Sequence, residues 1–196
     1  MNMNSLYIDT STKYLCIGIA KDYKLIYKYQ KEAVKMQSEL TIPVLKEALE
    51  ESHLFLNDIN EIVVTNGPGS FTGIRIGMCI AKVLSSLKKI PLKAISSLNA
   101  YASVGKKIVI LDAKANRAYL GIYNDNVKVI DECVVTIEEL KKIIEEYKDY
   151  EVVLDTFLVD MPESDIDVLE NMNRISPNIE CVSNVDALVP IYLKDR

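Results

Sequence analysis

The sequence has few of the residues from which metal sites and disulfide frameworks are built. Its 196 residues include no tryptophan, and His53 is the only histidine. The four cysteines are far apart and form no CxxC pair: Cys16, Cys79, Cys133 and Cys181. A two-histidine metal site is therefore excluded, and the cysteines are typical of a reduced intracellular protein rather than of a disulfide or zinc scaffold. We expect no bound metal.

Long apolar runs and long basic runs are also missing. No segment approaches the ~18 consecutive apolar residues of a membrane span. The opening residues, MNMNSLYIDT, show no basic region followed by an apolar stretch, so no signal peptide is indicated. The formal net charge is −5 without a Lys/Arg cluster, which argues against nucleic-acid binding by the chain alone. The sequence predicts a cytoplasmic protein with no membrane association.

What is present is an alternation of short apolar strands and amphipathic helices. Residues 5–11, 14–20 and 24–30 read as a strand meander, and 61–65 as a buried strand. A helix is expected over 36–52, with Pro43 requiring either a start near Thr41 or a kink. A second helix is expected to end near Leu87.

The meander then recurs with a constant offset of 103 positions, so that Asp9 aligns with Asp112. A helix over 136–148 and a strand over 151–155 follow, whereas we expect 156–196 to be polar and irregular. This order predicts an α/β, duplicated actin-like (ASKHA) fold made of two β-meander/α halves, the second reduced. We place the halves at 1–104 and 105–196.

ATPases of this fold class grip phosphate with a glycine that follows the hairpin aspartate. Neither hairpin has one, since the chain reads Asp-Thr-Ser-Thr from Asp9 and Asp-Ala-Lys-Ala from Asp112. We therefore expect no catalytic residues and no required cofactor, and leave open whether ATP or ADP binds. A remnant nucleotide cleft would be formed by Asp9, Thr10, Ser11, Gly67, Gly69 and Asp112.

The segment NGPGSFTGIRIG (66–77), at the start of the second helix, holds four of the seven glycines: Gly67, Gly69, Gly73 and Gly77. It does not match a P-loop, which ends in Gly-Lys-Ser/Thr, and it matches a dinucleotide-binding pattern only loosely. A tight turn with Ser70 or Thr72 as the helix N-cap explains part of it.

Gly73, Gly77 and Ala81 recur every four residues and form a small-residue stripe on the second helix. Such a stripe indicates close backbone packing, either against the protein's own sheet or against another chain. Our hypothesis is the second, with the first helix beside the contact. The expected partner-binding residues are Leu40, Val44, Glu47, Gly73, Gly77, Met78 and Ala81.

The segments IDTST, GPGSFTGIRIGMCIAK, LDAKANRAYLGIY and PIYLK resemble the TsaB (YeaZ) family of bacterial tRNA-modification proteins. The resemblance implies an actin-like fold and a non-catalytic subunit. It implies pairing with the catalytic paralogue TsaD through the first two helices. We expect the same surface to allow a homodimer when TsaD is absent. With the ATPase TsaE, the pair would support threonylcarbamoyl transfer to the adenosine beside the tRNA anticodon, and tRNA would be met only within the complex.

The sequence departs from the catalytic paralogue, whose first helix carries His-x-x-x-His, because no histidine occurs there. Gln37 stands where many relatives have histidine, and residues 150–190 resemble no known segment. Two other functions remain open: a degenerate ATP-dependent kinase of the same fold, and a peptidase of the glycoprotease-like group.

Overall fold

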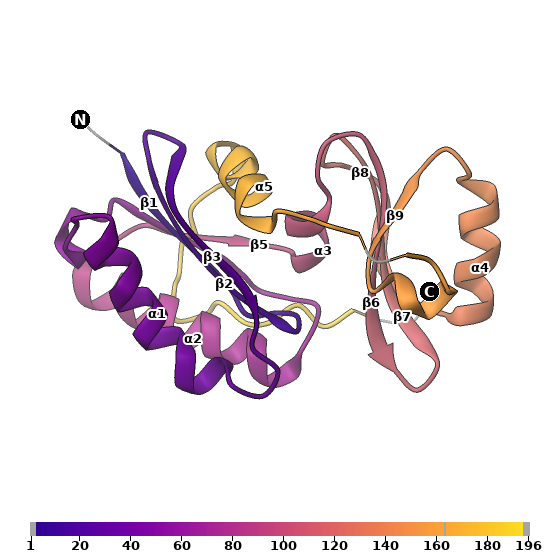
Figure 1. The fold of residues 1–196 in the computed structure, drawn as a ribbon, viewed down its shortest axis with the longest axis horizontal. Coiled ribbons are helices and arrows are strands. Elements are labelled where there is room, and N and C mark those ends of the chain that lie inside the picture. Colours follow the sequence, from indigo (N-terminus) through magenta and orange to yellow (C-terminus); the bar gives the residue numbers. More distant parts are fainter. Residues whose placement is uncertain (1–2, 163, 194–196) are drawn as a thin grey trace.

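The computed structural model describes residues 3–162 and 164–193, which form two sheets linked by helices (Figure 1). The first sheet has the strand order β3-β2-β1-β4-β5. Its strands are β1 (Asn4–Asp9), β2 (Tyr14–Lys21), β3 (Lys24–Glu32), β4 (Glu61–Thr65) and β5 (Leu92–Ile95). β1 and β4 are buried along their whole length, because helices cover both faces of the sheet.

Two long helices, α1 (Gln37–Glu51) and α2 (Phe71–Lys88), lie side by side on one face of this sheet (Figure 1). α1 begins earlier than Pro43 suggested, at Gln37, and Pro43 lies inside it. The first turn is held by two buried side chains: Gln37 Nε2 donates to the Thr12 carbonyl at 3.1 Å, and Thr41 Oγ1 donates to the Gln37 carbonyl at 2.5 Å. These bonds offset the one donor that proline removes.

The second sheet repeats the first without its fifth strand. Its order is β8-β7-β6-β9, with β6 antiparallel to β7 and parallel to β9, as β1 is to β2 and β4. Its elements are β6 (Lys106–Lys114), β7 (Arg117–Asn124), β8 (Val127–Thr136), α4 (Ile137–Glu146) and β9 (Glu151–Leu154). The predicted duplicated actin-like fold with a reduced second half is therefore confirmed.

The inner face of the first sheet is covered by α3 (Ser97–Tyr101) and α5 (Val168–Ile175), and α3 also contacts the second sheet. α5 corrects the prediction that 156–196 is irregular. Its apolar residues Val168, Leu169, Met172 and Ile175 are buried, and Leu169 lies against Gly18 of β2. The sequence pattern did not predict this helix because two of its buried residues, Asn171 and Asn173, are polar. Short 3-10 helices occur at Leu56–Asp58, Thr156–Val159 and Ser176–Asn178.

The chain returns to the first half after β9, although the sequence assigned residues 105–196 to the second. Beyond α5, Cys181 pairs with Lys93 of β5, and the Ile191 amide donates to the Asn66 carbonyl at 2.8 Å. The reason is that the first sheet has an inner face and an edge to be covered. Within the described residues, no helix combines the length and apolar character needed to cross a membrane.

Candidate functional site

Asp9, at the end of β1, is fully buried and its carboxylate is already hydrogen-bonded within the chain. Oδ1 accepts from the Ser11 amide (2.9 Å), Ser11 Oγ (2.6 Å) and Thr65 Oγ1 (2.5 Å), and Oδ2 accepts from the Tyr101 hydroxyl (2.8 Å). Burial and the adjacent Asp9 raise the pKa of Tyr101 well above its ordinary value, so its hydroxyl stays protonated and donates. Asp9 therefore stabilises the first hairpin through these hydrogen bonds, and its carboxylate is not free to bind a ligand.

The glycines of 66–77 allow the chain to cover this hairpin. A Cβ at Gly69 would lie 2.2 Å from the Ser11 carbonyl oxygen, and a Cβ at Gly73 would lie 2.0 Å from that of Thr10. Thr10 Oγ1 donates to the Gly73 carbonyl at 2.7 Å and accepts from the Gly77 amide at 3.1 Å. Ser70, rather than Thr72, caps α2 by accepting from the Gly73 amide at 3.2 Å.

The prediction that the small-residue stripe faces a partner is wrong. The buried residues of the expected partner surface are Val44, Gly73, Gly77, Met78 and Ala81. The small residues bring α2 onto the chain's own first hairpin, which is the other packing that the sequence allowed. Of the expected partner residues, only Glu47 is exposed and Leu40 half-buried.

A cleft of about 850 Å³ lies between the two halves. Three of the predicted cleft residues line it: Ser11, Gly69 and Asp112. The other three do not, because Asp9 and Thr10 are buried under the glycine segment and Gly67 packs against Ile74 and Ile191. The lining that the sequence did not predict includes Lys13, Lys35, Lys114, Asp155 and the exposed rings of Phe71 and Phe157.

Asp112 and Asp155 meet in this cleft at the ends of the parallel neighbours β6 and β9. Asp155 Oδ2 accepts from the Asp112 amide at 2.8 Å, while Asp112 bonds the Lys114 amide (2.8 Å) and forms an ion pair with its ammonium group. Burial, and then the Asp112 charge, raise the pKa of Asp155. The sequence did offer a signal for Asp155, because it is the aspartate at the end of the predicted strand EVVLD.

Replacing Asp155 by asparagine is expected to stabilise the chain at about pH 7, because the amide oxygen still accepts from Asp112 but carries no charge. The raised pKa means that the Asp155 carboxyl group binds a proton more tightly in the folded chain than in the unfolded chain. Stability contributed at this site is therefore lost as pH rises from the ordinary Asp pKa of about 3.9 through the raised one. In urea unfolding, the difference in unfolding free energy between Asp155→Asn and wild type should become smaller as the pH is lowered. The control is Asp131→Asn, at an exposed position. If the stability difference between Asp155→Asn and wild type is the same at about pH 7 and at acidic pH, the pKa of Asp155 is not raised in the folded chain.

The outer surface of α1 and α2 carries large apolar side chains that are exposed in the described chain. They are Ile42 (54% exposed) on α1 and Val83 (49%) and Leu87 (74%) on α2. A groove of about 600 Å³ runs along α2, lined by Arg75, Met78, Cys79, Lys82, Val83, Ser86, Leu87, Asp186, Leu188 and Pro190. The apolar side chains that line this groove are of the kind that is typical of an interaction site.

A family model described as TsaD, tRNA N6-adenosine threonylcarbamoyltransferase, matches residues 29–173. The chain belongs to this family. Relatives named "tRNA threonylcarbamoyladenosine biosynthesis protein TsaB" are 35% identical over 126 residues in Bacillus subtilis and 35% over 128 residues in Buchnera aphidicola of Schizaphis graminum. Each match covers 62% of this chain, but only 55% and 60% of the respective relative. The expected membership of the TsaB (YeaZ) family is confirmed.

Two further comparisons extend over nearly the whole chain. TsaB from Buchnera aphidicola of Acyrthosiphon pisum is 27% identical over 197 residues, covering 96% of this chain and 87% of the relative. The solved structure of YeaZ from Pseudomonas aeruginosa has a TM-score of 0.81 at 19% identity, covering 97% of this chain and 100% of that one. At this identity the structural match establishes the fold alone.

Proposed function

We propose that this TsaB-family chain is a non-catalytic subunit in the synthesis of threonylcarbamoyladenosine in tRNA. It pairs with the catalytic paralogue TsaD and, together with the ATPase TsaE, supports threonylcarbamoyl transfer to the adenosine beside the anticodon. It acts on tRNA only within that complex and requires no cofactor of its own. The names of the TsaB relatives support the pathway.

The non-catalytic role is supported by the first hairpin. In an actin-like ATPase this hairpin holds phosphate with backbone amides, whereas here Gly69 and Ser70 pack onto it and the Ser70 amide donates to the Ser11 carbonyl at 2.7 Å. The Asp9 carboxylate likewise accepts hydrogen bonds from Ser11, Thr65 and Tyr101. The chain's own residues thus occupy the position at which phosphate would be gripped.

The pairing role rests on the apolar groove along α2, which is the observation that carries the proposal. Cys79, Val83 and Leu87 are exposed at helical spacing on α2, in a different row from the buried glycine stripe. This face, rather than the stripe, is the partner surface.

The same face also suits pairing with a second copy when TsaD is absent. Exposed charged side chains on α1 are four glutamates (Glu39, Glu47, Glu50 and Glu51) and one lysine (Lys46), and those on α2 are the basic Arg75 and Lys88. A two-fold contact would set α1 of each copy against α2 of the other, so that opposite charges meet.

Val83→Glu is expected to weaken association with TsaD at least about tenfold, because a buried contact worth more than about 1.4 kcal/mol is lost and a charge is desolvated. Threonylcarbamoylation of tRNA, reconstituted from this chain, TsaD and TsaE, should fall in parallel. Association is measured by titration calorimetry.

Val127→Glu is the matched control, since Val127 is 69% exposed on β8 in the other half. Both variants should melt at the wild-type temperature. If Val83→Glu pairs as tightly as Val127→Glu, the interface lies elsewhere. If pairing is lost while modification continues, the subunit role itself is wrong.

A further inference from the structure

The second sheet ends one strand earlier than the first, so one edge of β9 is not paired with a strand. In the first sheet, β5 runs parallel along the corresponding edge of β4. The outer side of β5 is then closed by Cys181, which bridges to Lys93, and by the Val182 amide, which donates to the Leu92 carbonyl at 2.7 Å. In the second sheet the order stops at β9. An apolar edge strand with unpaired backbone groups is a template for another strand.

The backbone of Val152 is directed to this edge. The Asp155 amide donates to the Ile110 carbonyl of β6 at 3.0 Å. The Leu154 amide turns the other way and donates to Ser164 Oγ at 2.9 Å. Because backbone groups alternate between the two sides of a strand, the N–H and C=O of Val152 also point away from β6. They have no hydrogen-bond partner among the described residues.

A hollow of about 540 Å³ adjoins Val152 between the end of α4, β9 and the segment that follows the 3-10 helix Thr156–Val159. Its apolar lining comes from Ile144, Tyr150, Val152, Met161 and Pro162. Met161 is 42% exposed, so the hollow contains apolar surface that the chain itself does not bury.

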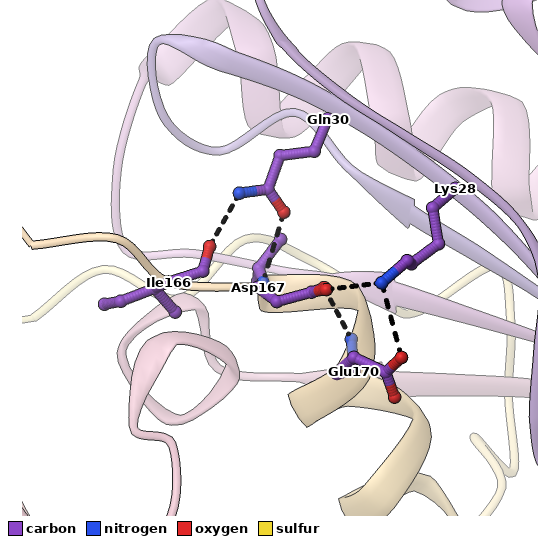
Figure 2. Close-up of polar contacts among 6 residues, drawn as sticks. Lys28, Gln30, Ile166, Asp167 and Glu170 are labelled. Atoms are coloured by element: carbon purple, nitrogen blue, oxygen red, sulfur yellow. Dashed lines mark hydrogen bonds and ion pairs between the residues drawn. The ribbon is translucent and has the colours of Figure 1, made fainter.

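The segment that borders the hollow is held at both of its ends. Ser164 accepts from β9, and further along Gln30 of β3 donates to the Ile166 carbonyl at 2.6 Å (Figure 2). Beside this bond, Lys28 forms an ion pair with Asp167 at 2.7 Å (Figure 2). The hollow is therefore a fixed part of the folded chain.

The first half shows what fits an edge of this kind. β4 reads Glu-Ile-Val-Val-Thr, and β9 with the next residue reads Glu-Val-Val-Leu-Asp, so Ile62 corresponds to Val152. The Ile62 amide donates to the Pro91 carbonyl at 2.9 Å, and the buried Leu92 lies opposite Ile62. A strand added to β9 in the same way would bring a carbonyl to the Val152 amide and an apolar side chain to the hollow.

The residue after Leu92 adds a charge preference. Lys93 forms an ion pair with Glu61 Oε2 at 2.8 Å. Glu151 corresponds to Glu61, and it is exposed and pairs with Lys107. A carboxylate accepts several hydrogen bonds, so it can bind a second cation. A basic residue directly after the apolar one would therefore meet a carboxylate at β9 as well.

We propose that the edge of β9 and the adjoining hollow bind an extended segment of a partner protein, which adds a fifth strand parallel to β9. The segment carries an apolar residue opposite Val152 and a lysine or arginine directly after it. Main-chain hydrogen bonds supply affinity, and the hollow and Glu151 supply specificity. This inference does not depend on the proposed function.

The test uses the full chain and a synthetic peptide with blocked ends, KIPLKAI, which copies residues 89–95. In amide NMR spectra, titration with this peptide should shift the resonance of Val152 and those of its neighbours in β9. Peptides with Leu92→Asp or Lys93→Glu should bind at least about tenfold more weakly, because the first brings a charge to the apolar hollow and the second opposes Glu151 with a like charge.

Met161→Glu in the chain is expected to weaken binding of KIPLKAI by at least about tenfold, because it places a charge in the hollow. Val129→Glu is the matched control and should bind as wild type does, since Val129 is 43% exposed on β8, at the other edge of the same sheet. Thermal melting establishes that both variants are folded.

The site is overturned if KIPLKAI leaves the Val152 resonance unmoved, or if folded Met161→Glu binds the peptide as tightly as Val129→Glu. It is also overturned if the edge is used by a second copy of the chain. In that case the full chain would be a dimer that Val152→Pro dissociates in sedimentation velocity, because proline removes the outward N–H.

Discussion

Gly73→Ala is expected to lower the free energy of unfolding by about 2–3 kcal/mol, although glycine to alanine inside a helix ordinarily raises it by about 0.5–1 kcal/mol. The new methyl carbon would lie 2.0 Å from the carbonyl oxygen of Thr10. That oxygen belongs to backbone held by Thr10 Oγ1, which bonds both the Gly73 carbonyl and the Gly77 amide. The clash can be relieved only by moving α2 off the first hairpin.

Urea unfolding of the purified chain measures this loss. Ser86→Ala, at an exposed position of the same helix, is the control and should leave stability within about 0.5 kcal/mol of wild type. If Gly73→Ala is as stable as Ser86→Ala, the glycine stripe does not pack on the hairpin, and a partner-facing stripe becomes tenable again.

Asp9→Ala is expected to destabilise the chain by about 3–5 kcal/mol, because each buried group left without a partner costs about 1–3 kcal/mol. The hydroxyls of Ser11, Thr65 and Tyr101 would all lose the acceptor they share. The loss falls on the fold rather than on a reaction, so folded residual protein should pair with TsaD normally.

The duplication supplies the control. Asp112 is the counterpart of Asp9 in the second half, but its carboxylate binds only Lys114 in the bonds described, at the edge of the cleft. Asp112→Ala should therefore cost less than about 1 kcal/mol in the same urea experiment. Equal losses in the two variants would mean that Asp9 has no special structural role.

Much of the fold could be read from local pattern. Strands over 5–11, 14–20 and 24–30 and the buried strand over 61–65 were predicted because apolar runs and turns are properties of adjacent residues. The same holds for α4, whose capping box joins Thr136 and Glu139. The offset that aligns Asp9 with Asp112 was sufficient to predict a duplicated fold with a reduced second half.

The sequence by itself also determined that the stripe of Gly73, Gly77 and Ala81 must meet a closely packed backbone. Only the tertiary structure decided which backbone, because a stripe of small residues specifies how near a neighbour comes and not which neighbour it is. The same reason applies to α5: its contacts join residues far apart in the chain. Periodicity within a segment carries no information about such pairs, and the folded chain alone brings them together.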